Sequence, residues 1–135
     1  MRPVTLRGAS PYLLAALFTT TGILHFVTPR TFDAIIPNAV PAKRAVTYLS
    51  GVGELACAGA LIRRRTRLWG ARASFMLLVV VFPANIQMAL DARGAIGRAL
   101  AYGRLPVQLP LLWWAWAVHR DTTRRQGATF TRPAR

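Results

Sequence analysis

The chain has 135 residues, of which 53% are hydrophobic and 16% charged, and its 18 Lys and Arg residues against four acids give a net charge of +14. The apolar residues fall in long runs, which excludes an ordinary soluble domain. The single cysteine, Cys57, excludes an intrachain disulfide and a dithiol redox motif. The composition therefore predicts a small membrane protein in which any electron chemistry comes from a bound cofactor or another subunit.

Four apolar runs come close to the roughly 20 residues that a helix needs to cross a bilayer core. They cover residues 11–27, 45–62, 73–90 and 99–118, and the last is weaker because Arg104 lies near its start. Aromatic residues lie mostly toward the run ends, as interfacial anchors do: Tyr48, Trp69, Tyr102, Trp113, Trp114 and Trp116. The sequence therefore predicts an all-α fold, a bundle of four transmembrane helices in one domain of residues 1–120.

The first run begins with Ser10 and Pro11, a capping residue followed by a proline, which predicts the start of a helix. Because no small-x-small cleavage site follows the run, we expect an uncleaved span rather than a secretion signal. In the next connection, from Arg30 to Arg44, Thr31 could cap a short helix that lies in the membrane interface. Its apolar side would be formed by Phe32, Ile35 and Ile36.

Small residues and prolines predict further features of the bundle. The second run should be its centre, because small residues let helices approach closely: Gly51, Gly53, Ala56, Ala58, Gly59 and Ala60. Pro83 removes a backbone hydrogen bond from the third run and frees the carbonyl of Val79. Pro106 and Pro110 predict a similar distortion of the fourth run. Residues 121–135 are polar and Arg-rich, which predicts a disordered basic tail.

The basic residues are unevenly distributed between the connections. Twelve of the 18 precede the first run, join the second to the third, or follow the fourth, whereas the first and third connections hold the other six. This bias predicts a multi-pass protein of the cytoplasmic (inner) cell membrane with both termini in the cytoplasm. Because topology explains the charge, we expect no nucleic-acid partner. Membrane lipids are expected partners, and binding of anionic head groups by residues 63–67 stays open.

Glu54 lies in the middle of the second run, which carries no other charge between residues 45 and 62. An ionisable group at bilayer depth costs a few kcal/mol or more, so it normally faces protein or a wet cavity and has a partner. Glu54 therefore indicates a functional site. A structural ion pair or hydrogen bond with Arg104, Gln108 or His25 would also satisfy it.

The strongly polar residues of the spans belong to the outer half of the predicted bundle. At about 1.5 Å per residue, His25 lies near the mouth and Glu54 deepest. Ser50 and Glu54 share a helix face, as do Arg104 and Gln108. We predict one wet pocket that opens outward, with Glu54 and His25 as candidate catalytic residues. The candidate ligand-binding residues are Ser50, Asn85, Gln87, Arg104 and Gln108. For Asn85 and Gln87, hydrogen bonding between helices is the competing interpretation.

Other kinds of site find no support in the sequence. His25 and His119 fall on opposite sides of the predicted bilayer, so one chain builds neither a bis-histidine haem site nor a His-rich metal site, and we expect no metal. The sequence contains no phosphate loop, nucleophile elbow or dinucleotide fingerprint.

Several strings, in this order and spacing, resemble the DoxX-like family of small bacterial membrane proteins. They are Gly22-Ile-Leu-His25-Phe26 with Pro29 and Phe32, Ile36-Pro37 with Pro41, Ser50-Gly51-Val-Gly-Glu54, Phe82-Pro83-Ala-Asn85-Ile-Gln-Met88, and Arg104-Leu-Pro106-Val-Gln108. The resemblance covers nearly the whole chain except its tails and implies a four-helix membrane bundle. Named members include a subunit of a terminal quinol oxidase and a thiosulfate:quinone oxidoreductase. This chain departs from a self-sufficient redox enzyme, because it has one cysteine and no evident cofactor ligands.

Three functions remain in view. The first is an accessory subunit of a membrane redox complex with a pocket for a lipophilic ligand such as a quinone, whose carbonyls need hydrogen-bond donors. The second is an intramembrane enzyme that acts on a lipophilic substrate by acid–base chemistry through Glu54 and His25. The third is a structural or assembly protein whose polar residues only fix helix register.

Overall fold

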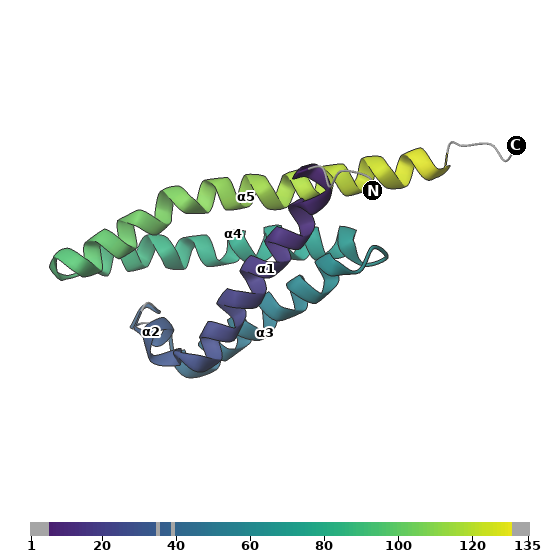
Figure 1. Cartoon of the computed structure of the whole chain (residues 1–135). Helices are drawn as coiled ribbons and strands as arrows, with labels where there is room; N and C mark the ends of the chain where they lie inside the picture. Colours follow the sequence, from purple (N-terminus) through teal and green to yellow (C-terminus); the bar gives the residue numbers. More distant parts are fainter. Residues whose placement is uncertain (1–5, 35, 39, 131–135) are drawn as a thin grey trace, which may run out of the picture.

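The computed structural model of the chain describes residues 6–34, 36–38 and 40–130, and the regular structure of these residues is helical throughout. The helices are α1 (Leu6–Val27), α2 (Pro29–Asp33), α3 (Lys43–Ile62), α4 (Arg67–Asp91) and α5 (Gly94–Phe130). α1 packs mainly on α3 and α4 mainly on α5, and contacts between α3 and α4 join the two pairs (Figure 1). The prediction of an all-α fold is confirmed.

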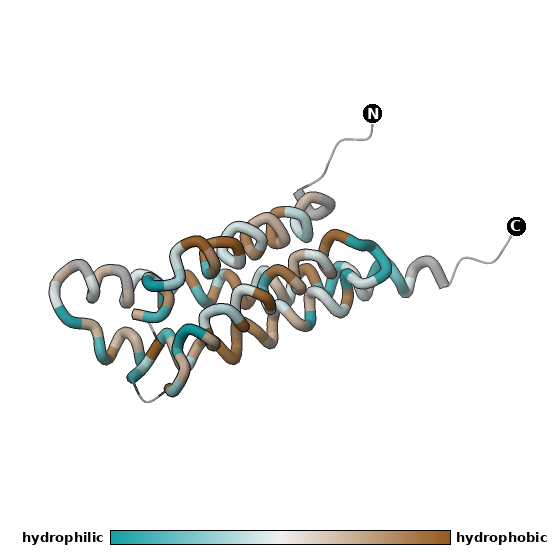
Figure 2. The backbone as a smooth tube through the Cα atoms, turned by 90° about the horizontal axis from the view of Figure 1, so that it is seen from below, coloured by the Kyte–Doolittle hydropathy of each residue, from teal (hydrophilic) through white to brown (hydrophobic). Residues whose placement is uncertain are grey.

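Three helices are long and apolar enough to cross a membrane: Ala9–Val27, Lys43–Ile62 and Arg67–Asp91. Large apolar side chains also point outward from every long helix, and Val27, Leu49, Val80 and Leu109 are each more than 60% exposed. A soluble protein of this size rarely exposes so much apolar surface. Hydrophobic residues follow the helices and hydrophilic ones gather at the turns (Figure 2). The helices therefore have the surface of a membrane protein.

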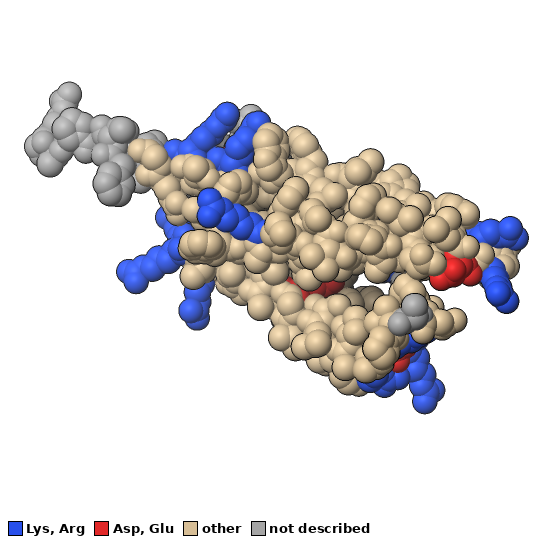
Figure 3. Space-filling view, turned by 180° about the vertical axis from the view of Figure 1, so that it is seen from behind, with Lys and Arg blue, Asp and Glu red and all other residues tan. Residues whose placement is uncertain are grey.

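On the face drawn in Figure 3, basic side chains gather toward the two ends of the molecule, and the surface between them is mostly without Lys or Arg. Four guanidinium groups lie over aromatic rings near these ends: Arg67 over Tyr12, Arg72 over Trp69, Arg120 over Trp116 and Arg44 over Tyr48, at 4.4–5.8 Å from the ring centres. Aromatic rings and long cationic side chains both favour the boundary between lipid and water. The predicted anchoring role of the aromatic residues is consistent with this pairing.

α1 does not begin at Ser10. The helix begins at Leu6 and contains Pro11, so the predicted start is wrong. A proline this close to a helix start removes a single backbone hydrogen bond, which a long helix tolerates. The Ser10 hydroxyl accepts a hydrogen bond from Trp114 Nε1 at 2.8 Å and so ties α1 to α5. Its partner lies 104 residues away, which the local capping pattern could not reveal.

α5 continues through Phe130, so the predicted disordered tail is wrong for residues 121–130, while residues 131–135 lie outside the described part of the chain. Arginine and glutamine are good helix formers, and their polarity does not end a helix that has water beside it. Thr122 is buried, and its hydroxyl donates to the Val118 carbonyl at 2.7 Å. Pro106 and Pro110 lie inside α5, which bends along its first half (Figure 1).

The connection between α1 and α3 contains the expected short helix. α2 begins at Pro29 rather than at Thr31, because a proline in the first turn already has the backbone angle that a helix needs. Thr31 therefore lies inside α2 and does not cap it. Ile35, predicted on the apolar side of this helix, lies outside the described residues.

The hydrophobic core occupies the end of the bundle where α3 turns into α4. Its buried side chains come from α1, α3, α4 and α5: Leu14, Ala15, Phe18, Cys57, Ala58, Leu61, Ala71, Leu78, Ala115 and Val118. At this turn the Arg67 side chain donates hydrogen bonds to the carbonyls of Leu61 at 2.8 Å and Ile62 at 3.1 Å. Toward α2 the two helix pairs spread apart (Figure 1). The open end is where the predicted site residues lie.

α1 and α3 cross closely because glycines face each other. A Cβ atom added to Gly22 would lie 2.9 Å from Leu55 Cγ, and one added to Gly51 would lie 2.8 Å from the Cβ atom of His25. Each position therefore has room for the hydrogen atom of glycine but not for a methyl group. Small residues let membrane helices cross this closely. The crossing sets His25 level with Gly51 and therefore within reach of Glu54, one turn further along α3.

Candidate functional site

His25 and Glu54 meet across the α1–α3 crossing. His25 Nδ1 lies 3.9 Å from Glu54 Oε2, but it lies 2.8 Å from the backbone oxygen of Thr21. A carbonyl oxygen only accepts, so Nδ1 carries the hydrogen in this contact. Glu54 Oε2 is buried and has no hydrogen-bond partner among the described residues. The predicted pair exists, but His25 does not satisfy the carboxyl.

The ring of His25 is covered by Phe32 of α2. The two rings stack with their centres 3.8 Å apart and their planes 23° apart. α2 is fixed to α3 by Asp33, whose carboxylate accepts hydrogen bonds from Thr47 Oγ1 at 2.6 Å and Arg44 Nε at 2.7 Å. These contacts join residues that no sequence pattern connects. The only available signal was that Asp33 is one of four acids in a basic chain.

The attachment of α2 should weaken in acid. The Thr47 hydroxyl, and then Arg44, hold the pKa of Asp33 below its usual value. A pKa lowered by folding stabilises the fold at neutral pH, and that contribution is lost as pH falls through the lowered pKa. We expect hydrogen–deuterium exchange of the α2 amides, relative to unfolded-peptide rates, to rise on going from about pH 6 to pH 3. In Asp33→Asn the exchange should be fast and nearly independent of pH; a pH response equal to wild type would contradict this account.

Asn85 and Gln108 join α4 to α5. Asn85 Nδ2 donates to Gln108 Oε1 at 3.2 Å, and Gln108 Nε2 donates to the backbone oxygen of Leu78 at 2.7 Å. Both side chains are buried. The bonded carbonyl is next to that of Val79, which Pro83 was predicted to free. This arrangement supports hydrogen bonding between helices as the role of Asn85 and Gln108.

Replacing Gln108 by leucine should therefore weaken the α4–α5 contact. Hydrogen bonds between membrane helices contribute about 0.6 kcal/mol each on average and up to about 1.7 kcal/mol, and we expect a loss of unfolding free energy in that range. Unfolding in mixed detergent micelles would measure it. Gln87→Leu is the matched control because Gln87 is exposed on α4. Equal losses in the two variants would contradict the proposed role of Gln108.

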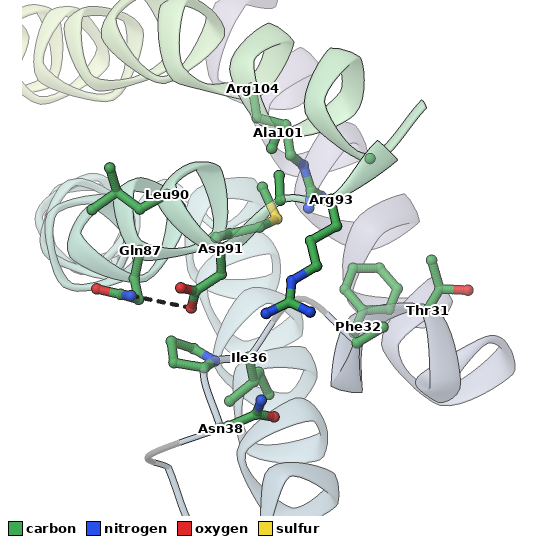
Figure 4. A pocket seen from close by; sticks show the side chains of 15 residues that line it. Thr31, Phe32, Ile36, Asn38, Gln87, Leu90, Asp91, Arg93, Ala101 and Arg104 are labelled. Atoms are coloured by element: carbon green, nitrogen blue, oxygen red, sulfur yellow. Dashed lines mark hydrogen bonds between the residues drawn. The ribbon is translucent and has the colours of Figure 1, made fainter. Parts of the chain in front are cut away.

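A cleft of about 1340 Å³ lies between the α2 segment and the α4–α5 junction. Its wall includes the apolar residues Phe32, Ile36 and Met88 and the polar residues Gln87, Arg93 and Arg104 (Figure 4). Gln87 Nε2 donates to Asp91 Oδ2 at 3.1 Å, and both side chains face the cleft (Figure 4). Two of the five predicted ligand-binding residues, Gln87 and Arg104, therefore lie on one cleft wall. Arg93 was missed, since it follows the third run as an ordinary flanking charge.

The His25–Glu54 pair lies next to this cleft but not on its wall. Phe32 lines the cleft and also stacks on His25. Arg104 also lines the cleft. The Glu54 side chain is 17% exposed. The structure thus separates the predicted site into a cleft, a neighbouring His25–Glu54 pair, and the structural Asn85–Gln108 pair.

Ser50 lies one turn before Glu54 and is half-buried, but it is not among the residues of the cleft wall. Its predicted role in ligand binding gains no support from its position.

Comparison with known proteins finds one family. Residues 14–119 match the family described as "Domain of unknown function (DUF8561)", and the match takes in every candidate site residue. No curated protein and no solved structure matches the chain. Because the matched residues make up most of the sequence, the protein belongs to this family of unknown function.

Proposed function

We propose that the protein is a DoxX-like, four-span membrane protein that binds a lipophilic small molecule of the quinone kind in the α2–α4–α5 cleft. The observation that carries the proposal is the cleft itself, which combines apolar walls with the donors of Arg93 and Arg104. Pockets for lipophilic ligands are mostly apolar with a few polar groups that orient the ligand. The single cysteine supports an accessory role beside a redox partner subunit rather than self-sufficient redox catalysis.

The proposed fourth span is the apolar part of α5, within residues 99–118. It carries no charge between Arg104 and Arg120, and the Arg120 guanidinium lies 4.4 Å from the Trp116 ring centre. With four spans, the charge bias predicts cytoplasmic termini, an interfacial α2 and a cleft that opens at the outer side. In a Cys57→Ser background, a cysteine at position 93 should react with an impermeant maleimide in intact cells. A cysteine at position 64 should not; the reverse pattern would refute this orientation.

Ligand binding can be tested without knowing the ligand. Mass spectrometry of a lipid extract from the detergent-purified protein should show a lipophilic molecule at near one per chain. Arg104→Gln should lower its occupancy about tenfold, which is the effect of about 1.4 kcal/mol. Arg98→Gln is the matched control, because Arg98 lies on the same helix but off the cleft wall. An empty wild-type protein that also fails to take up added quinone would refute the proposal.

An intramembrane acid–base enzyme is the second candidate. The Glu54 carboxyl beside His25 favours it, because an ionisable group inside a membrane span often marks a path for protons. Glu54→Gln should then abolish conversion of the extracted ligand while the protein still accumulates in the membrane. Conversion at the wild-type rate would rule out this candidate.

A further inference from the structure

Phe32 belongs to a helix that takes no part in the hydrophobic core. α2 is five residues long, and none of these residues is buried. A helix this short is unstable by itself in water, so the position of Phe32 depends on what α2 contacts. Asp33 fixes the end of the helix to α3 through Thr47 Oγ1 at 2.6 Å and Arg44 Nε at 2.7 Å. These bonds hold the backbone of α2, but they leave the direction of the Phe32 ring to be fixed by another contact.

His25 supplies the contact that fixes the Phe32 ring. The two rings stack with their centres 3.8 Å apart. The His25 side chain is itself held in place, because Nδ1 donates to the backbone oxygen of Thr21 at 2.8 Å and the residue is only 8% exposed. A Cβ atom added to Gly51 would lie 2.8 Å from the Cβ atom of His25, so α3 lies against the base of the side chain. His25 therefore offers Phe32 a fixed surface on which to pack.

His25 reaches the cleft through Phe32. Phe32 is among the residues that line the cleft, whereas His25 is not (Figure 4). The Nδ1 hydrogen of His25 goes to Thr21, and Nδ1 lies 3.9 Å from Glu54 Oε2, beyond hydrogen-bond distance. The contact that leads from His25 to the cleft is therefore made by the ring as an aromatic surface.

We propose that His25 is a positioning residue whose ring holds Phe32 in the cleft wall, where Phe32 contacts the bound ligand. This inference rests on the proposed function, because it gives His25 a part in binding the quinone-type ligand. A flat quinone ring buries apolar area against an aromatic wall, and a wall that is already in place binds more tightly than one that must be ordered on binding. Binding then requires the ring of His25 and not its nitrogen atoms.

Two substitutions of His25 separate the ring from its nitrogen atoms. His25→Phe keeps a flat ring that can stack on Phe32, whereas His25→Asn keeps a donor for the Thr21 oxygen and loses the ring. Equilibrium dialysis of the full-length protein in detergent micelles against protein-free micelles would measure the binding of decylubiquinone. His25→Phe should bind it as tightly as the wild type does. His25→Asn should bind it about threefold to tenfold more weakly, which is the effect of one lost aromatic pair.

A double-mutant cycle assigns the loss to Phe32. Phe32→Leu should weaken binding as well, and in that background His25→Asn should cause no further loss, because the contact that it removes is already gone. A residue that acts only by stabilising the fold would cause the same loss in both backgrounds. Phe26→Leu is the matched control, because Phe26 follows His25 on α1 and stacks on Tyr48 of α3 with the ring centres 5.4 Å apart, but it is not on the cleft wall. This control should leave the affinity unchanged.

The inference is overturned, while the proposed function stands, if His25→Phe loses as much affinity as His25→Asn, if the losses in the cycle are additive, or if Phe26→Leu weakens binding equally. If His25→Asn fails to accumulate, a loss of binding in His25→Phe or unchanged binding in Phe32→Leu still overturns it. If the wild type binds no decylubiquinone, the proposed function fails and the inference fails with it.

Discussion

Replacing Gly51 by alanine is expected to lower the free energy of unfolding in detergent by about 1–3 kcal/mol, the usual cost of overpacking. The added Cβ atom would lie 2.8 Å from the Cβ atom of His25, 2.8 Å from Phe26 Cε2 and 3.0 Å from the backbone oxygen of Gly22. The His25 Cβ atom and the Gly22 oxygen cannot move without the α1 backbone, so α1 and α3 must move apart. The displacement would also separate His25 from Glu54 and should weaken any binding that depends on the pair.

Gly59 provides the matched control on the same helix. A Cβ atom added there meets no atom within 4 Å. Gly59→Ala should leave the protein as stable as wild type or stabilise it by up to about 1 kcal/mol, because alanine favours helix more than glycine does. Equal effects of the two substitutions on the unfolding midpoint would show that the α1–α3 crossing is looser than described.

Replacing Glu54 by leucine is expected to raise the free energy of unfolding by about 1–3 kcal/mol. The wild-type carboxyl has a buried oxygen without a partner among the described residues, and removing an unsatisfied polar group of this kind recovers its desolvation cost. Leucine has a similar volume and suits a helix facing other apolar side chains. Unfolding in mixed detergent micelles, with retained monodispersity as a check on folding, would measure the gain.

This substitution separates a functional from a structural role. A residue retained for binding or catalysis often reduces stability, so its removal makes the protein more stable and less active. If Glu54 instead fixes helix register, Glu54→Leu should lower stability and accumulation. Loss of stability would therefore favour the structural or assembly role over both functions proposed above.

The transmembrane character could be predicted because it depends on local sequence. Long apolar runs mark α1, α3 and α4, whatever their partners are. The ends of the helices were less predictable. Ser10 has the pattern of a cap but bonds to Trp114, and the polar residues after 120 continue α5, in which Thr122 is buried. Both outcomes depend on contacts between distant parts of the chain.

The candidate site was predictable to the extent that polarity in an apolar span is visible in sequence. Glu54 and His25 were found in this way, and they do meet. Sequence could not show that Asn85 and Gln108 bond to each other instead of facing the cleft. Nor could it single out Phe32, an ordinary apolar residue whose importance comes from stacking on His25. The depth of a residue in the membrane can be estimated by counting residues along its helix. The direction of its side chain depends on how the helices are rotated against each other.

The Arg67 side chain donates hydrogen bonds to the carbonyls of Leu61 and Ile62. It therefore links the direction of membrane insertion to the stability of the α3–α4 hairpin. Arginines at this turn are among those expected to decide which way the chain inserts. Neutralising them to invert the insertion would also remove the donor that closes the α3–α4 hairpin, so an inverted copy would enter the bilayer with its central hairpin frayed. The same mutations would therefore impair both the correct insertion of this protein and the early formation of its hairpin.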